Sequence, residues 1–459
     1  MTTAKRASLA VFGVLSLFSG SSAADDQPRA PEAHDAMLTP VPAARREIAT
    51  WEEALGLVKA RSTDLRLVLL DVHRADAQWR SALGAALPSL NGTATAANQF
   101  ITTESRQISG VTPAGPLFTQ VQTPFPNAAN GSLSMSQPMF APRAWWAIGT
   151  AEEGRVLAGL AVDEAKRQIV LSVAQAIIGV FTAERISELN REGLRNALQR
   201  LDLAQRKFDL GAGTGLDLVR ARTDVAAARG TLVAGNEALR KAREALGLSL
   251  GIAGEVGVAR DVRLDGLEAS AVRTCKPSPI EERSDLLVAR QRVKLAERQL
   301  TDARLLFSPT LTAQSAISTT TMDTGVAPPT TWNIQGILSV PIWEGGARYG
   351  AMHDARAQIR AAEERHEALR RTATVQLDQA KRGVGVAEER RAVAQDARRL
   401  AAEQDDLVRR AFGEGRGTSL ELVAAAAAMR EAEIALALRE FELVQARVLA
   451  VLSFATCPY

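Results

Sequence analysis

Two long parts of the chain combine an apolar pattern of helical period with a complete lack of proline. No proline occurs between Pro142 and Pro277, or between Pro341 and Pro458, and both stretches are rich in Ala, Leu, Arg, Glu and Gln. Proline destabilises a helix interior by about 3 kcal/mol, whereas these residues are strong helix formers. Coiled-coil-like steps of four and three occur at Leu194, Leu198, Leu201, Gln205 and Phe208. The pattern predicts helices from Arg143 to about Leu210, roughly 100 Å long, and from Leu216 to about Leu250.

A glycine-rich turn ends the first long helix, and the same arrangement occurs a second time. The segment Phe208–Val219 matches Phe412–Val423, and a carboxylate follows each turn, at Asp217 and at Glu421. Shorter similar segments precede the two turns: Pro88-Ser89-Leu90 has a counterpart in Pro309-Thr310-Leu311. Similar segments that recur in the same order are the mark of an internal repeat. Each half is therefore expected to run helix, strand, loop, strand, long helix, turn, helix.

The expected strands alternate apolar and hydroxyl side chains. Leu311, Ala313, Ser315 and Ile317 alternate with Thr310, Thr312, Gln314 and Ser318, and Leu133 and Met135 alternate with serines. A period of two over about ten residues suits a tilted membrane strand with lipid on one side and water on the other. The Thr-, Pro- and Gly-rich stretches 102–130 and 320–331 are expected as outer loops.

Four strands cannot close a barrel around a water-filled lumen, whereas about twelve strands from three chains can. The predicted fold class is mainly α with a membrane β-barrel. Long helical hairpins form a trimeric α-barrel, and four transmembrane strands per chain give a 12-stranded trimeric barrel, with an internal two-fold repeat.

The N-terminus reads as a secretory signal peptide. Lys5 and Arg6 precede the apolar run Leu9–Phe18, and small residues end at Ala24. A membrane anchor is the alternative, but the run is too short for a bilayer core of about 30 Å. The expected divisions are a signal peptide at 1–24, an extended segment at 25–48, a first repeat at 49–252, a linker at 253–279, a second repeat at 280–455 and a tail at 456–459.

Composition narrows the class of protein further. The chain has 459 residues, 55 Lys and Arg against 52 Asp and Glu, and only 4% aromatic residues. So few aromatics argue against a large compact core, and the lack of a basic block argues against nucleic-acid binding. Beyond the N-terminal run, no uninterrupted apolar stretch of about 18 residues is found, which argues against a helical membrane protein.

Residues for chemistry are sparse. The four histidines, His34, His73, His353 and His366, show no metal-ligand spacing. No cofactor is expected. A phosphate-binding loop at the first glycine turn is excluded because no strand precedes the turn and no Gly-Lys-Ser/Thr follows. Export permits a disulfide between Cys275 and Cys457, and two inert thiols are the alternative.

In these features the chain resembles the outer-membrane efflux protein family, the TolC-like channel-tunnels. The similarity runs from Trp51-Glu52-Glu53-Ala54-Leu55 to Leu452 and includes the Ser-Val-Pro-Ile-Trp-Glu-Gly-Gly segment that begins at Ser339. The two Gly-Thr turns add to it. Each motif is weak alone, but their order and duplication make the resemblance specific.

The resemblance implies a homotrimer in the outer membrane with a large periplasmic portion and no catalysis. Its implied partners are outer-membrane lipid, a periplasmic adaptor and an inner-membrane ABC or proton-driven transporter. The cargo is an exported protein or a small molecule. The lack of a lipidation cysteine favours type I protein secretion, including adenylate cyclase-haemolysin-type toxins, and multidrug or small-molecule efflux is the alternative.

By position in the family, the periplasmic gate candidates are Asp217, Phe412, Arg416 and Glu421. Phe412 stands where a tyrosine is frequent, and Gly417 stands at an arginine position with Arg416 one residue earlier. A carboxylate–guanidinium link could hold the helices closed, and acidic caps at helix starts are the alternative.

Two further sets of residues follow from their positions in the predicted elements. The hairpin-tip residues, expected at positive φ and as the adaptor dock, are Gly211, Gly213, Gly215, Gly415 and Gly417. The aromatic residues expected at the membrane interface, with ordinary strand–helix packing as the alternative, are Phe140, Trp145, Trp146, Phe307 and Trp343.

Two other classes of protein fit part of the pattern. A soluble periplasmic coiled-coil adaptor would explain the hairpins and the export signal, but not the alternating strands or the full-length duplication. An exported enzyme would need a convergent set of acid, base or nucleophile, and none is evident in the sequence.

Overall fold

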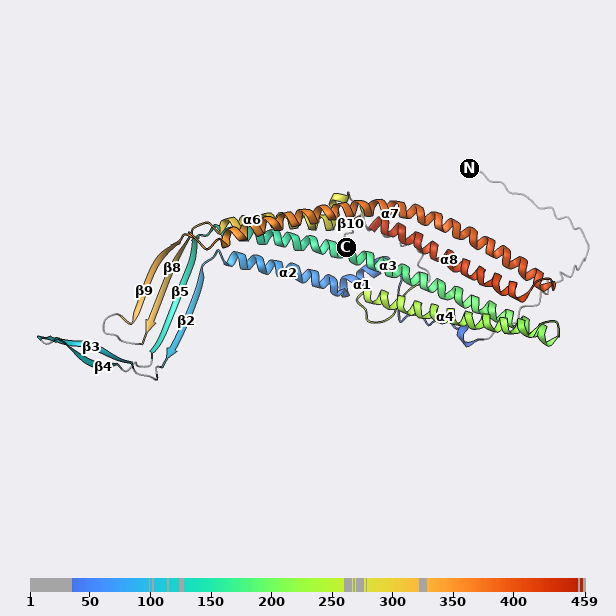
Figure 1. Cartoon of the computed structure of the whole chain (residues 1–459), viewed down its shortest axis with the longest axis horizontal. Helices are drawn as coiled ribbons and strands as arrows, with labels where there is room; N and C mark the ends of the chain where they lie inside the picture. Colours follow the sequence, from blue (N-terminus) through green and yellow to red (C-terminus); the bar gives the residue numbers. More distant parts are fainter. Residues whose placement is uncertain are drawn as a thin grey trace, which may run out of the picture.

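The chain folds into an elongated body with a small β-sheet at one end of a long wall of helices (Figure 1). The computed structural model describes residues 35–98, 100, 103–113, 115–123, 128–259, 266, 269, 276–277, 279–321, 328–452 and 455–456. The predicted signal peptide at 1–24 lies outside these residues.

Two helical hairpins make up most of the wall. The first hairpin consists of α3 (Pro142–Asp209) and α4 (Gly215–Ser249), and the second of α7 (Ala347–Gly413) and α8 (Ser419–Leu452). Pro142 begins α3 at a position where its missing N–H is not needed. The predicted helices over 143–210 and 216–250 are confirmed to within a residue at each end.

Shorter helices extend the wall toward the sheet. They are α1 (Trp51–Arg61), α2 (Thr63–Gly84) and α6 (Ser284–Leu305), with 3₁₀ turns at Ala36–Leu38 and Ile280–Glu282. The first half begins with two helices because Ser62 ends α1 and caps α2, where its hydroxyl accepts a hydrogen bond from Leu65 N (3.2 Å).

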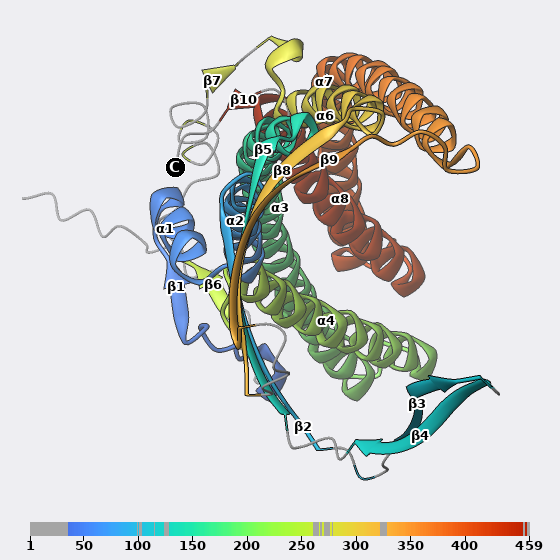
Figure 2. The ribbon, with the colours of Figure 1, turned by 90° about the vertical axis from the view of Figure 1, so that its left-hand side faces the viewer.

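The sheet has four antiparallel strands in the order β2-β5-β8-β9. Its strands are β2 (Ser89–Ala97), β5 (Ala128–Phe140), β8 (Thr310–Thr320) and β9 (Thr330–Ser339). Seen along the molecule, the sheet is curved (Figure 2). All four strands lie where the repeat predicts them, with β5 and β8 at the alternating segments. In this order β2 and β9 form the two open edges of the sheet.

The prediction of an outer loop over residues 102–130 is partly wrong. Within 102–130, β3 (Thr103–Thr112) and β4 (Gly115–Thr123) form an antiparallel ribbon that extends away from the sheet (Figure 1). The turn follows from Pro113 and from Gly115 at φ +127°, and the Thr112 hydroxyl donates to Gly115 O (2.9 Å). A stretch rich in threonine next to a Pro-Gly turn is a hairpin signal.

Two short strand pairs lie to one side of the long helices (Figure 2). There β1 (Arg46–Ile48) pairs in parallel with β6 (Val256–Val258), and β7 (Lys276–Pro277) pairs with β10 (Ala455–Thr456). The largest core cluster joins this region to the long helices, and its members include Ile48, Trp51, Val58, Val173, Val180, Leu246, Leu250 and Val448.

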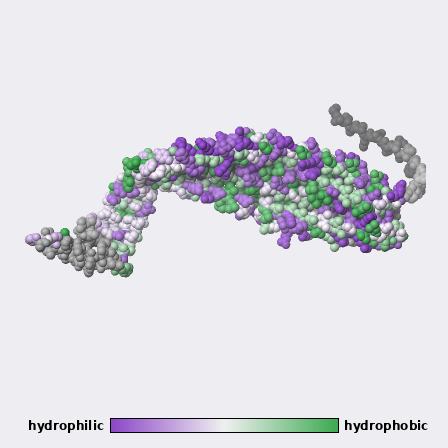
Figure 3. All heavy atoms as spheres, in the orientation of Figure 1, coloured by the Kyte–Doolittle hydropathy of each residue, from purple (hydrophilic) through white to green (hydrophobic). Residues whose placement is uncertain are grey.

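Within the described residues, α3 alone is long and apolar enough to cross a membrane, but 44% of its most apolar window is buried inside the chain. The helix packs against α2, α4, α6 and α8, so its apolar residues serve the core of the wall. Figure 3 shows a mostly hydrophilic surface along α6 and the adjoining part of α7.

Candidate functional site

The four-stranded sheet has two chemically different faces. Directly paired residues share a face, and the row Thr93, Ser132, Ser318 and Thr331 crosses all four strands. In this row Thr93 Oγ1 lies 2.6 Å from Ser132 Oγ, and Ser318 Oγ lies 2.8 Å from Thr331 Oγ1. The pairing makes a continuous hydroxyl surface on one face.

The opposite face is apolar. Leu90 pairs with Met135, while Leu133, Ile317 and Trp332 form a row across three neighbouring strands. None of the four strands carries a charged residue. The sheet can therefore expose one face to hydrocarbon and the other to water.

The five predicted interface aromatics all lie where strands meet helices, but their environments differ. Trp146 donates from Nε1 to Arg298 O (3.0 Å), and the Arg298 guanidinium stands 4.1 Å from its ring. Phe140 meets Trp145 edge-on at 5.7 Å, and Trp343 is 74% exposed. Trp146 therefore also packs between helices, whereas Trp343 projects outward.

Arg348 shapes the loop that carries Trp343. This buried side chain donates to Pro341 O (3.0 Å) and to Glu344 Oε2 (3.0 Å), and lies 5.1 Å from the Phe307 ring. These contacts hold the loop from inside, and its Trp343 side chain is exposed. The membrane-interface role of the aromatics stays a prediction.

The glycine turns at the far ends of the hairpins differ from the expectation. Only Gly211 (φ +72°) and Gly415 (φ +76°) have a positive φ. Gly213 and Gly417 are needed for close approach instead, because a Cβ at Gly417 would lie 2.9 Å from Phe412 N. Gly215 has neither requirement, and its Cβ would make an ordinary contact of 3.8 Å with Phe208.

Each turn ends in a helix cap. Thr214 N donates to Asp217 Oδ2 (3.1 Å) and Asp217 N donates back to Thr214 Oγ1 (3.2 Å). In the second turn Thr418 N donates to Glu421 Oε2 (2.9 Å). The Thr418 backbone N–H and hydroxyl hold the pKa of Glu421 below its usual value.

Asp217 also joins the two hairpins. The Ser419 hydroxyl at the start of α8 donates to Asp217 Oδ1, and Arg220 Nη1 donates to Ser419 Oγ (3.3 Å). The hydrogen bond from Ser419, followed by those from Thr214, holds the pKa of Asp217 below its usual value. This inter-hairpin link is charge-assisted.

A second contact joins the same two hairpins. Lys207 Nζ at the end of α3 donates to Phe412 O (3.2 Å) and lies 3.7 Å from the centroid of the Phe412 ring. Phe412, which lacks a hydroxyl, thus takes part through its carbonyl and its ring face.

The other predicted gate residues make no inter-hairpin contact in one chain among the described residues. Arg416 pairs with Glu414 in its own turn, and Glu421 caps its own helix. Sequence reasoning missed Ser419, Arg220 and Lys207. The repeat carried a signal for Ser419, because it aligns with Gly215 and is the hydroxyl that the first turn lacks.

Cys275 and Cys457 lie outside the described residues, and their disulfide stays a prediction. Their sequence neighbours are paired, with Lys276 opposite Thr456 in the antiparallel β7–β10 ladder. In the part of the chain that the structure describes, no group of three or more His, Cys, Asp or Glu could hold a metal ion.

The model of the family described as "Outer membrane efflux protein" matches residues 54–252 and 278–449, one segment in each half of the chain. The chain belongs to the outer membrane efflux protein family. Membership confirms the predicted family and the predicted location, the outer membrane with a large periplasmic portion.

Two relatives from this family illustrate the similarity in sequence. The cation efflux system protein CusC of Escherichia coli is 27% identical over 291 residues, covering 62% of this chain and 59% of CusC. The toluene efflux pump outer membrane protein TtgC of Pseudomonas putida is 22% identical over 305 residues, covering 64% of this chain and 60% of TtgC. The matched part thus spans about three fifths of either relative.

Solved structures confirm the fold. The CmeC outer membrane channel of Campylobacter jejuni superposes with a TM-score of 0.73 at 15% identity, covering 94% of both chains. The predicted fold of one chain, long helical hairpins joined to four strands in a two-part repeat, is therefore confirmed.

Proposed function

We propose that this efflux family protein is the outer-membrane channel of a pump that expels small solutes, and that three copies close into one tube. The proposal rests on one observation: the sheet and the helical wall each end in two open edges. In the sheet these edges are β2 and β9. An open strand edge in a membrane needs a partner, because its backbone groups find no water there.

The helical wall ends at the same two edges. Along the periplasmic half its order is α4, α3, α8, α7, and nearer the sheet it is α2, α3, α6, α7. One edge thus consists of β9 and α7, and the other consists of β2 with α2 and α4. Joining β9 and α7 of one copy to β2, α2 and α4 of the next closes both parts at once.

The side chains of α7 fit this arrangement. In its second half, four exposed apolar residues recur every seven positions, at Val386, Val393, Leu400 and Leu407, and are 43–69% exposed. On α4, Val219 and Val233 are exposed in the same way. Apolar residues at a period of seven form the seam of a coiled coil, so we assign these stripes to contacts between copies.

The hydroxyl face of the sheet would line the outer part of the tube. Because it carries no charge, it offers little selectivity by sign and can pass solutes of varied chemistry. The inter-hairpin links at Asp217 and Lys207 would hold the periplasmic end closed, and the glycine turns would meet an adaptor. Energy would come from an inner-membrane transporter of the ABC or proton-driven class.

The two functions that the sequence leaves open, protein secretion and small-solute efflux, differ in their cargo. The lack of a lipidation cysteine favoured type I protein secretion, whereas the names of CusC and TtgC refer to cation and toluene efflux. These relatives support the small-solute alternative better, and we adopt it.

A gene deletion tests this choice. We expect the deletion strain to become several-fold more sensitive to antibiotics, organic solvents or copper, with an unchanged set of secreted proteins, and wild-type complementation to restore resistance. Unchanged sensitivity together with the loss of a large secreted protein would instead establish the secretion reading.

A further inference from the structure

A cavity of about 250 Å³ lies between the two hairpins, next to the contact of Lys207 with Phe412. Its walls come from three helices. Arg200 and Leu203 lie on α3, Arg409 and Phe412 lie on α7, and Leu422 lies on α8. Since α3 belongs to the first hairpin and the others to the second, the cavity exists only while the two hairpins are together.

The polar side of the cavity consists of two arginines and two neutral amides, Asn196 and Gln199. Arg200 Nε donates to Asp224 Oδ2 (3.1 Å), and Arg409 Nη2 lies 2.7 Å from Asp405 Oδ2. Both carboxylates are buried. A guanidinium has five N–H donors, and these contacts use only part of each set. Lys207, which donates to Phe412 O, adds a third cation nearby, and Asp405 Oδ1 is buried without a hydrogen-bond partner.

The remaining wall is apolar. Leu203, Phe412 and Leu422 form a hydrophobic surface beside the two guanidinium groups. A volume of about 250 Å³ is just below the range of roughly 300–1,000 Å³ that is usual for drug-sized ligands. The occupant must therefore be compact, with one anionic end and one apolar end.

We propose that this inter-hairpin cavity binds a compact amphipathic carboxylate, such as an aryl or medium-chain acid, and that binding favours the closed arrangement of the hairpins. The carboxylate accepts hydrogen bonds from Arg200 and Arg409, and the apolar body packs on Leu203, Phe412 and Leu422. The effect on closure rests on the proposed function, whereas the site itself does not.

Ligand binding favours the closed arrangement of the hairpins through thermodynamic linkage. A ligand that touches both hairpins loses half its contacts when they separate, so it binds the closed arrangement more tightly. The coupling is reciprocal, because any change that weakens closure must weaken binding by the same factor. Asp217 does not line the cavity, so a variant there tests coupling without touching the ligand.

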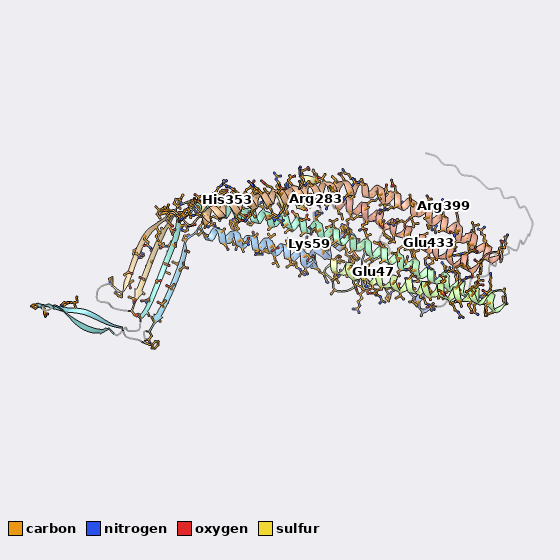
Figure 4. The ribbon with its side chains drawn as sticks, in the orientation of Figure 1. Glu47, Lys59, Arg283, His353, Arg399 and Glu433 are labelled. Atoms are coloured by element: carbon orange, nitrogen blue, oxygen red, sulfur yellow. The ribbon has the colours of Figure 1, made fainter. Side chains whose placement is uncertain are left out.

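Binding is tested with 1-naphthoate and its neutral analogue 1-naphthylmethanol, by calorimetry on the full chain in nanodiscs with empty nanodiscs subtracted. We expect saturable naphthoate binding that Arg409→Gln weakens about tenfold, the size of one charge-assisted hydrogen bond. Arg399→Gln removes an exposed guanidinium elsewhere on α7 (Figure 4) and should leave binding unchanged. Leu203→Trp should fill the cavity and abolish binding.

Coupling is tested in planar bilayers. Naphthoate should lower the open fraction of the wild-type channel, and Asp217→Asn should weaken naphthoate binding. Equal binding of the two probes, equal losses in Arg399→Gln and Arg409→Gln, or no saturable binding would overturn the site. Binding without any change in the open fraction would overturn the coupling alone. A wild-type chain that forms no channel would refute the proposed function and leave the calorimetric result standing.

Discussion

Ser419 shows how one hydroxyl can connect two parts of the molecule. It begins α8, where its side chain reaches Asp217 of the first hairpin while Arg220 donates to the same oxygen. The caps at Thr214 and Thr418 are local, so a Thr-x-x-acid pattern in the sequence predicts them. The Ser419 link depends on how two hairpins 200 residues apart lie together, which no local pattern contains.

Removing this hydroxyl should open the channel. We expect Ser419→Ala to raise the open fraction in planar bilayers about fivefold, because one hydrogen bond contributes about 1 kcal/mol. Thr418→Ala is the matched control, since the neighbouring hydroxyl serves only its own turn. If both variants behave like the wild type, the link does not hold the hairpins together.

The same link should respond to strong acid. Hydrogen bonds lower the pKa of Asp217 in the joined arrangement, which therefore binds fewer protons than the parted one. The link is fully present above the usual aspartate pKa of about 3.9 and is lost as pH falls through the lowered value.

Conductance recorded against pH checks this dependence. The open fraction should stay constant from about pH 7 to 5 and rise below about pH 4, near the ordinary carboxyl range. Ser419→Ala should show a smaller acid response because it lacks the main cause of the pKa shift. A rise centred near neutral pH would point to a different group.

At the scale of elements, the long helices were predictable because proline and glycine mark their ends unambiguously. Two of the four strands, β5 and β8, were predictable from alternation, and β2 and β9 from the order of elements in the repeat. The ribbon of β3 and β4 was missed because loop-like composition hid its pairing. The three-residue strands β1 and β6 form only because the core around Trp51 brings distant segments together, so their sequence alone carries no signal.

The two-residue ladder of β7 and β10 supports the prediction of a disulfide. Cys275 precedes Lys276 and Cys457 follows Thr456, and these two neighbours are paired in register. We therefore expect a disulfide between the two cysteines in chain purified from the cell envelope. Peptide mass spectrometry without reducing agent should find the linked pair, and two separately alkylated cysteines would contradict the prediction.

At the scale of the whole molecule, the edges of one chain are its most informative feature. The strands and the helical wall end together, and exposed apolar residues line α7 at steps of seven. Sequence alone indicated three copies through strand arithmetic, but only the folded chain reveals that the two kinds of edge coincide.

A charge in the α7 stripe should disrupt the assembly. We expect Leu400→Asp to abolish the trimer, because it buries a carboxylate in an apolar seam. Arg399→Asp, one residue away, changes a side chain that pairs only along its own helix and should leave assembly unchanged. Assembly can be read by crosslinking in isolated outer membranes, and an intact Leu400→Asp trimer would contradict the assignment of the stripe.

The most direct test of the account is native mass spectrometry of the full-length protein released from a membrane mimetic. Closure of both edges by neighbouring copies predicts a single species with the mass of three chains. A stable monomer, or an assembly of any other number, would contradict it.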